Sequence, residues 1–279
     1  MIQRLEYRLS SQRPLIMGIL NMTPDSFSDG GLHCDPTHAL THAGQMLEDG
    51  ADIIDVGGES TRPGSSPVSP DEQCRRIVPS IVAIREKSPE LCLSVDTMSS
   101  KVAEAALARG AVMINDVSAG EQDSAILSVV AEHGAYIVLM HKKGDPLTMQ
   151  DSPGYENVVS EVSDYLRSRI DVALDRGISE HRIILDPGIG FGKSRAHNLA
   201  LLRNLKSITE IGFPVLLGCS RKRFMGALCN ESRPSELLGA TVATTALAVR
   251  DSVKLFRVHD VKANRQAADL AWHLQSNSD

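Results

Sequence analysis

Polar and charged side chains follow short apolar runs throughout this 279-residue chain. In chain order, the positions after eight such runs hold Asn21, Asp55, Asp96, Asn115, His141, Asp186, the turn 218–222, and Arg257 with His259. Groups of this kind form hydrogen bonds to polar ligands, although any single Asp or Asn is equally well explained as the cap of a following helix. Eight such positions together favour a ligand-binding site.

Arg257 and His259 predict an anion site. They lie two residues apart, so both side chains point to the same side if the strand continues, and Asp260 begins the last predicted helix. Barrel enzymes often hold phosphate near the loops after strands 7 and 8, using helix N-termini. We therefore expect this pair to bind a phosphate or diphosphate. Arg62 offers a guanidinium fork to phosphate or carboxylate, with a solvated surface arginine as the alternative.

The segment ILDPGIGFGKS (184–194) is a glycine-rich turn that fits neither the P-loop pattern nor the GxGxxG fingerprint. Glycines after Asp186 let the backbone approach a flat ligand closely, and Phe191 is placed to cover that ligand. In the basic turn CSRKRF (219–224), we expect one of the three basic side chains to point into the site.

Eight apolar runs alternate with eight stretches of helical periodicity, which is typical of βαβ units. The predicted strands are 15–20, 52–56, 91–95, 111–114, 135–140, 182–185, 214–217 and 254–258. The predicted helices are 37–49, 70–87, 99–109, 122–133, 155–176, 195–210, 234–249 and 261–274. Eight nearly all-apolar strands, each with a helix, suit a closed parallel barrel. The sequence predicts an α/β fold, a (β/α)8 TIM barrel with residues 1–279 as one domain; an open doubly wound sheet is the alternative.

Caps and long loops mark the connections. Asp35 and Pro36 predict a helix start, Gly50 predicts its end, and Ser69 with Glu72 fits a capping box. The segments 21–36 and 57–69 are long for connections between a strand and a helix, and long ordered loops tend to be lids or binding loops.

Composition excludes several classes of function. Net charge is −6, and no basic stripe suits nucleic acid. The first residues lack a secretory apolar region, and no run approaches the ~20 apolar residues of a membrane span. The five cysteines form no CxxC motif. We expect a cytoplasmic protein with reduced thiols that binds neither nucleic acid nor membrane.

Several stretches resemble dihydropteroate synthase, in the same order and from about residue 14 to 270. They are MGILNMTPDSFSDGG, GADIIDVGGESTRPG, SVDT, INDVS, LDPGIGFGK, GCSRKRFMG and RVHDV. The resemblance implies a TIM barrel that forms a homodimer. It also implies condensation of 6-hydroxymethyl-7,8-dihydropterin diphosphate with 4-aminobenzoate, giving 7,8-dihydropteroate and pyrophosphate in folate biosynthesis. The implied cofactor is Mg²⁺.

Site residues follow from the same resemblance. The pterin ring is expected to contact Asp96, Asn115, Asp186 and Lys222. The diphosphate is expected to contact Thr61, Arg257 and His259, with Asn21 beside the metal. The 4-aminobenzoate is expected to lie near Arg62, Pro63, Phe191 and Ser220. Asp55 lies in a matching motif, and we expect it to have a supporting or metal-linked role.

The implied mechanism needs no strong base, because an aromatic amine is already neutral near pH 7. We expect the diphosphate to leave first, in an SN1-like route, with cationic groups and Mg²⁺ stabilising its charge. The residues expected to be catalytic are Asn21, Asp96, Lys222, Arg257 and His259. The segment 23–31 is expected to close over the ligands as a lid.

Two other functions fit part of the pattern. A methyltetrahydrofolate methyltransferase-type barrel would share the pterin pocket but lack the diphosphate set, so STRPG and RVHDV disfavour it. A catalytically silent relative that binds pterin or a protein is disfavoured by the intact Asn21, Lys222, Arg257 and His259.

Overall fold

The computed structural model describes residues 1–22, 36–60, 65–144, 149 and 153–275. The whole of the predicted lid 23–31, the predicted cap Asp35, and the predicted site residues Thr61, Arg62 and Pro63 lie outside these ranges. Within the described ranges, no helix combines the length and apolar character needed to cross a bilayer.

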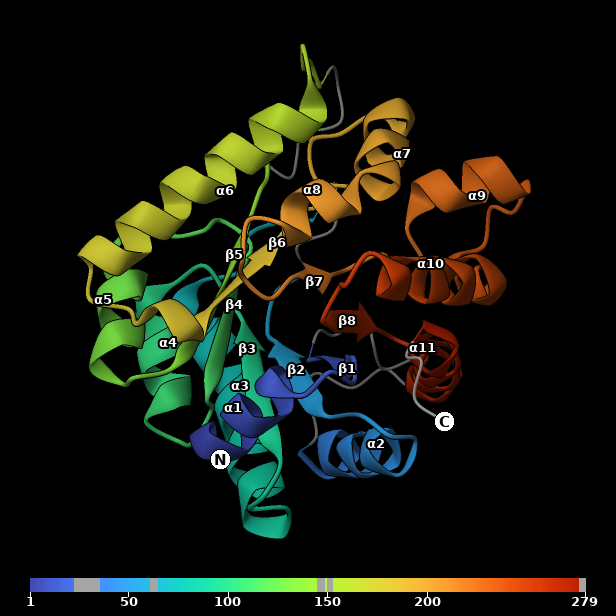
Figure 1. The fold of residues 1–279 in the computed structure, drawn as a ribbon. Coiled ribbons are helices and arrows are strands. Elements are labelled where there is room, and N and C mark those ends of the chain that lie inside the picture. The colour runs from blue at the N-terminus through green and yellow to red at the C-terminus, as the bar shows by residue number, and fades with distance from the viewer. Residues whose placement is uncertain (23–35, 61–64, 145–148, 150–152, 276–279) are drawn as a thin grey trace.

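Eight parallel strands form the centre of the molecule (Figure 1). They are β1 (Leu15–Asn21), β2 (Ile53–Gly57), β3 (Cys92–Asp96), β4 (Met113–Asp116), β5 (Tyr136–Met140), β6 (Ile183–Asp186), β7 (Leu216–Leu217) and β8 (Leu255–Val258). Neighbouring strands pair in the order β6-β5-β4-β3-β2-β1-β8-β7, and a parallel bridge between Leu185 and Val215 joins the two ends. The TIM barrel is confirmed, and the alternative of an open doubly wound sheet is wrong.

Each of the eight predicted helical stretches contains a helix. These helices are α2 (Pro36–Glu48), α3 (Pro70–Lys87), α4 (Ser100–Leu107), α5 (Ala125–Glu132), α6 (Val158–Asp175), α7 (Arg195–Arg203), α8 (Leu205–Thr209), α10 (Leu238–Arg250) and α11 (Val261–Gln275). One stretch is divided into α7 and α8 at Asn204. The sequence pattern did not predict α1 (Ile2–Ser10), α9 (Arg223–Cys229) or the short 3-10 turn Glu180–Arg182; the start of the predicted stretch 234–249 forms a separate 3-10 turn, Pro234–Glu236, before α10.

Two of the predicted caps fall within the described residues. The Ser69 hydroxyl accepts a hydrogen bond from the Glu72 backbone N–H at 3.3 Å, so half of the capping box is present. The Glu72 carboxylate accepts hydrogen bonds from Arg75 and Arg76 instead of turning back to the cap. Gly50 follows α2 with a φ of +97°, a conformation that glycine adopts without strain.

Strand alternation divides the core into two layers. Every second strand residue points inward and packs in the barrel interior, including Met17, Ile53, Tyr136 and Val138. The other strand residues pack outward against the surrounding helices. The inward positions at the carboxyl ends of the strands are different, because polar residues occupy most of them.

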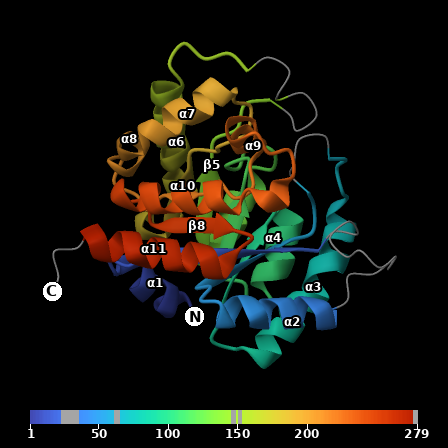
Figure 2. The ribbon, with the colours of Figure 1, turned by 90° about the vertical axis from the view of Figure 1, so that its right-hand side faces the viewer.

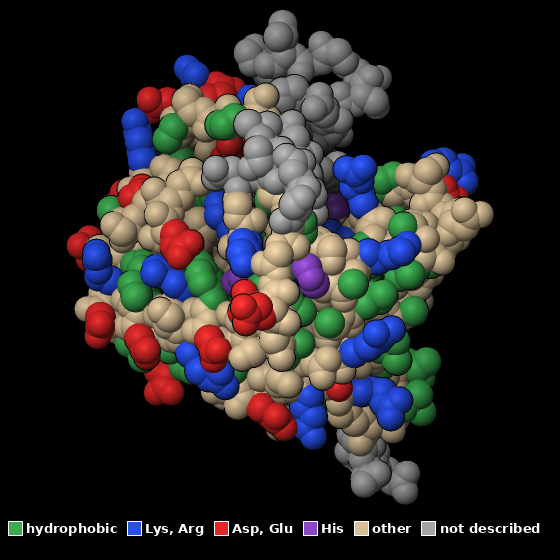
Figure 3. All heavy atoms as spheres, turned by 90° about the horizontal axis from the view of Figure 1, so that it is seen from above, with side chains coloured by type: hydrophobic (Ala, Val, Ile, Leu, Met, Phe, Trp, Pro, Cys, Tyr) green, Lys and Arg blue, Asp and Glu red, His purple; other side chains and the backbone are tan. Residues whose placement is uncertain are grey.

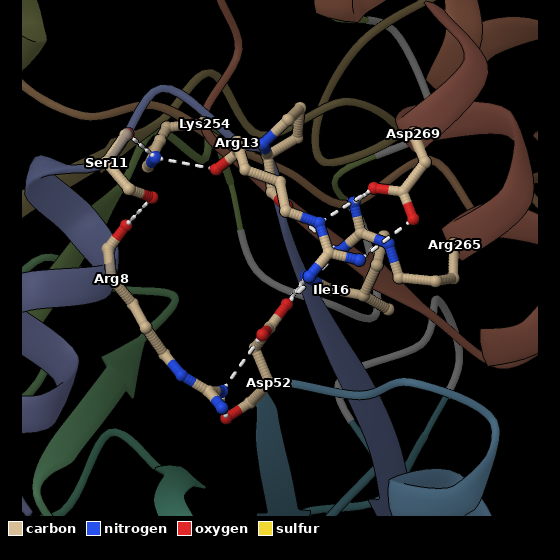
Figure 4. A network of polar contacts seen from close by, with 9 residues as sticks. Arg8, Ser11, Arg13, Ile16, Asp52, Lys254, Arg265 and Asp269 are labelled. Carbon is tan, nitrogen blue, oxygen red and sulfur yellow. Dashed lines mark hydrogen bonds and ion pairs between the residues drawn. The ribbon is translucent and has the colours of Figure 1, made fainter. Parts of the chain in front are cut away.

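Helix α1 closes the opposite, amino-terminal end of the barrel. Its Leu5 is fully buried in the interior cluster, with Ile2 and Leu9 packed beside it. Asp52, 8% exposed, fixes this arrangement (Figure 4). Its carboxylate accepts hydrogen bonds from the backbone N–H of Ile16 at 2.9 Å, from Arg8 at 2.9 Å and from Arg265 at 3.2 Å.

The Asp52 network thus connects α1, β1 and α11. Arg265 also donates to Asp269 at 2.5 Å, and Arg13 pairs with the same carboxylate at 2.8 Å. Lys254 donates to the backbone carbonyls of Ser11 and Arg13. The network lies at the end of the barrel where fold stability, rather than chemistry, is normally decided.

The outer surface carries both signs of charge and an apolar patch. Acidic and basic side chains are interspersed over the face in Figure 3. Helices α10 and α11 run side by side along the outside of the barrel (Figure 2). Leu247 of α10 and Leu270 of α11 are each 63% exposed, and Leu274 is 80% exposed. We call these three leucines the α10–α11 patch.

Candidate active site

Polar side chains meet inside the carboxyl end of the barrel, where the sequence predicts a site. Asp96 and Asp186 end β3 and β6, Asn115 is the last residue but one of β4, and all three are at least 94% buried. Asp96 pairs in register with Asn115 and with Gly57 of β2. Because strand residues alternate, all three side chains occupy inward positions. Asn21 ends β1 in the corresponding position beside Gly57.

Arg257 is ion-paired to two buried carboxylates, those of Asp96 and Asp55. Its Nε donates to Asp55 Oδ2 at 2.6 Å, and its Nη2 donates to Asp96 Oδ2 at 2.7 Å. Asp55 is fully buried one step deeper in the barrel, paired in register with Ser94, and it also accepts from Asn115 Nδ2 at 3.2 Å. One carboxylate therefore orients both the arginine and the carboxamide.

Burial controls the charge of the site. It raises the pKa of Asp96; the Arg257 guanidinium opposes this effect, and the Asp55 carboxylate adds to it. Burial also raises the pKa of Asp186 to about 6, against the stabilising Gly188 N–H and Lys222. Asp96 Oδ1 and Asp55 Oδ1 have no hydrogen-bond partner among the described residues. A ligand that donates N–H groups would therefore stabilise the ionised form of Asp96.

The glycine-rich turn packs directly on the end of β5. Gly188 donates its backbone N–H to Asp186 Oδ1 at 2.7 Å. Gly188 and Gly192 have φ angles of +68° and +61°, and a Cβ at either position would overlap the carbonyl of His141 or Lys143 respectively. The turn thus requires glycine for close packing as well as for its backbone conformation.

Phe191 forms an apolar wall beside the polar groups. Its ring packs with Met98, Val117 and Met140, which follow or end neighbouring strands. The Nζ of Lys222 lies 4.2 Å from the centre of the Phe191 ring. Of the three basic residues in CSRKRF, Lys222 is therefore the one beside the turn. An apolar wall beside buried carboxylates is the kind of lining that binds a flat ring with polar edges.

The loops after β7 and β8 are fastened to each other. Ser220 Oγ lies 2.9 Å from His259 Nδ1 and accepts the His259 backbone N–H at 3.2 Å. Arg221 forms a bidentate pair with Asp260, at 3.0 and 2.7 Å. This second contact explains why Arg221, unlike Lys222, is directed to the neighbouring loop.

Sequence reasoning did not single out two residues at this site. Lys193 is 2% exposed and contacts the turn that precedes it. In the sequence Met140 looks like an ordinary apolar strand residue, but in the structure it lies at the rim of the site and packs with Phe191. Two features of the sequence could have identified them. Lys193 ends a glycine-rich turn, and Met140 occupies an inward position of β5 when every second residue is counted from Tyr136.

The fold agrees with comparisons to known proteins. A family model described as pterin binding enzyme matches residues 17–259. The chain is 46% identical over 251 residues to a dihydropteroate synthase from Streptococcus pyogenes serotype M6, covering 90% of this chain and 91% of that protein. The structure is similar to that of a dihydropteroate synthase from Xanthomonas albilineans with 4-aminobenzoic acid, with TM-score 0.89, 44% identity, and coverage of 97% and 95%. A dihydropteroate synthase structure from the same organism in complex with 7,8-dihydropteroate gives TM-score 0.86, 40% identity, and coverage of 97% and 96%.

Proposed function

This chain belongs to the dihydropteroate synthase family of pterin-binding enzymes, and from that membership we propose how its residues carry out the reaction. The enzyme is a transferase that joins the pterin methylene of 6-hydroxymethyl-7,8-dihydropterin diphosphate to the amine of 4-aminobenzoate. The observation that supports the assignment of residues best is the buried group of Asp96, Asn115 and Asp186 beside an apolar wall.

The pterin ring is the ligand for that group. Its aminopyrimidinone edge presents adjacent N–H donors and a carbonyl, which match carboxylates and a carboxamide. Asp96 Oδ1 is buried and has no partner among the described residues, so it is suited to accept one of these N–H groups. Asn115 and Asp186 contact the same edge, Lys222 reaches the other polar edge, and Asp55 positions Asn115 and Arg257.

The diphosphate lies toward the loops after β7 and β8. The Ser220 hydroxyl accepts the His259 backbone N–H and lies 2.9 Å from His259 Nδ1; we assign the hydroxyl proton to this second contact, which leaves the ring proton on Nε2. We assign that N–H to the diphosphate. The Arg257 guanidinium, held beside the pterin carboxylates, adds positive charge where the leaving group departs.

Mg²⁺ is the proposed cofactor. Within the described residues there is no cluster of three or more His, Cys, Asp or Glu side chains that could hold a metal ion. Mg²⁺ commonly binds through one or two protein oxygens together with water and substrate phosphates. The carboxamide of Asn21, at the end of β1, fits that pattern. When bound, Mg²⁺ would neutralise charge on the leaving diphosphate.

The proposed route is dissociative. The amine of 4-aminobenzoate is neutral, so the chain's residues need not remove a proton before attack. Asp96 and Asp186 instead stabilise positive charge on the pterin as the carbon–oxygen bond breaks, and Arg257 and His259 stabilise the departing anion. Strict inversion at a chirally labelled methylene would contradict this route.

The 4-aminobenzoate is proposed to lie above the pterin, near Phe191 and Ser220. Three further proposed contacts, Thr61, Arg62 and Pro63, belong to a segment outside the described residues. Closure of the segment 23–31 over both ligands remains part of the same proposal. Equal protease protection of that segment with and without ligands would count against the lid.

Pyrophosphate release tests the function. The purified protein should release pyrophosphate when both substrates and Mg²⁺ are present, and omission of 4-aminobenzoate should stop release. Asp96→Asn keeps the shape of the side chain, and we expect kcat/KM to fall at least about a hundredfold. Asp164→Asn is the control, because Asp164 lies in a surface pair with Arg167. An inactive wild-type protein would favour the silent relative.

A homodimer in the cytoplasm completes the proposal. The α10–α11 patch supports the homodimer, because exposed leucines grouped on neighbouring helices mark association surfaces. Leu270→Glu should convert a dimer to a monomer in light scattering after gel filtration. Leu228→Glu, at a 50% exposed leucine of α9, is the matched control and should remain dimeric. A dimer unaffected by Leu270→Glu would place the interface elsewhere.

A further inference from the structure

Lys193 is a buried lysine to which the proposed chemistry assigns no role. Only 2% of the residue is exposed. Its Nζ lies 2.8 Å from the Gly188 carbonyl oxygen, 3.0 Å from the Phe191 carbonyl oxygen and 2.8 Å from His141 Nδ1, with the His141 carbonyl oxygen at 3.3 Å. An ammonium has three N–H donors and no acceptor, so these four acceptors use all of its donors.

The contact with His141 fixes the state of that histidine. Because an ammonium can only donate, Nδ1 must accept, and the ring is neutral with its proton on Nε2. Burial and the Lys193 charge lower the pKa of His141 to about 3, which agrees with this assignment. His141 at the end of β5 is therefore an uncharged anchor for Lys193.

Two other charged side chains act on Lys193. The Asp186 carboxylate attracts the ammonium and Lys222 repels it, while burial lowers the pKa of Lys193 to about 7. A neutral amine would bring only two donors to the same four acceptors. The ammonium is therefore the form that satisfies the turn most fully.

The turn that Lys193 binds carries two parts of the proposed site. Gly188 donates to Asp186, and the Phe191 ring lies against Lys222. Two of the three carbonyls that accept from Lys193 belong to these same residues, Gly188 and Phe191, and the third is that of His141. The ammonium thus connects the start and the tip of the turn to β5 through His141.

We propose that Lys193 is a positioning residue of the synthase site, which fastens the turn 188–193 to the end of β5 and so holds Phe191 in place beside Lys222. Lys193 itself touches neither substrate. The inference rests on the proposed function for its kinetic consequence, but the fastening of the turn can be measured without any substrate.

Hydrogen–deuterium exchange tests the fastening directly. In folded Lys193→Met, we expect amides in the 186–193 peptide to exchange about tenfold faster or more, because two carbonyls lose their donor. Lys206→Met is the matched control, since Lys206 is an exposed lysine of α8 with a long 3.8 Å contact to Glu210. If Lys193→Met does not fold, Lys193→Gln, which retains two donors, replaces it. Unchanged exchange in the folded variant overturns the proposal, whatever its activity.

A double-mutant cycle tests the consequence for catalysis. Lys193→Met should raise KM for 4-aminobenzoate about tenfold and change kcat less, because the turn is displaced while the carboxylates remain. If Lys193 acts through Phe191, then Phe191→Ala will have a smaller effect in the Lys193→Met background than alone. Additive effects would show that Lys193 acts on the fold only and would refute the proposal. An inactive wild type would refute the function, while the exchange result would still decide the fastening.

Discussion

Asp55→Asn is the most informative perturbation of the site, because Asp55 holds one proposed pterin contact, Asn115, and one proposed diphosphate contact, Arg257, at once. The substitution keeps the size of the side chain but removes the charge that accepts Arg257 Nε at 2.6 Å. A hydrogen bond to a charged group contributes about 1.5–3 kcal/mol. The 3.2 Å contact with Asn115 adds about 0.5–1 kcal/mol.

The total expected loss in the free energy of unfolding is therefore about 2–4 kcal/mol. This expected loss is somewhat smaller than the roughly 3–5 kcal/mol lost when a buried ion pair is broken completely. The reason is that Arg257 keeps its second partner, Asp96, at 2.7 Å. For a chain of this length the melting temperature should fall by about 3–7 °C. Urea denaturation gives the free energy, and kcat/KM for the pterin substrate should fall with it, because Asn115 and Arg257 lose their shared acceptor.

The matched control is Asp164→Asn, which removes an exposed carboxylate from a surface pair and should change the unfolding free energy by less than about 1 kcal/mol. An unfolding free energy within about 0.5 kcal/mol of wild type, which is the error of the measurement, would refute the assigned role of Asp55. So would a normal kcat/KM in a destabilised variant, because the carboxylate would then support only the fold.

Three further outcomes are expected. Asp52→Asn should lower the unfolding free energy by about 2 kcal/mol and leave kcat/KM unchanged, because it loosens the end of the barrel opposite the site; a fall in kcat/KM per folded molecule would contradict this. Gly192→Ala should lower the urea midpoint and cost at least about 2 kcal/mol, whereas Gly239→Ala, with nothing near its added Cβ, should not; equal midpoints would show that the turn adapts. Pterin affinity should fall as the pH drops from about 8 to about 5, because Asp96 and Asp186, whose pKa values burial raises to about 7 and about 6, must both be ionised to accept N–H groups; in calorimetric titration over this range Asp186→Asn should give a shallower fall that comes from Asp96 alone, and an unchanged slope would contradict the role of Asp186.

Most of the barrel could be predicted from sequence because its signal is local. All eight apolar runs became strands, with ends shifted by at most two residues, since apolar patterning and helix caps act over a few positions. Helix α1 was missed although Ile2, Leu5 and Leu9 have helical spacing. Three apolar residues in a short polar stretch do not by themselves predict a helix. They form one here because their apolar face packs against the end of the barrel.

The rim of the site was predicted, but its contacts were not. Strand ends place Asp96, Asn115 and Asp186 together in any parallel barrel. The sequence did not show that Arg257 pairs with Asp55 and Asp96, because those contacts depend on the closing register between β1 and β8. It also did not show Lys193 turned back into its own loop, since that direction follows from three left-handed glycines.

The pairing of β1 with β8 has a consequence for biosynthesis on the ribosome. Arg257 and Asp55 are 202 residues apart in sequence, and β1 acquires its second neighbour only when β8 emerges. Until then the nascent sheet has an open edge, which can pair with other chains. A chain that stops before β8 therefore lacks the arginine of the site and also exposes a sheet edge prone to aggregation. The barrel therefore closes, and Arg257 pairs with Asp55 and Asp96, in the same step, late in the synthesis of the chain.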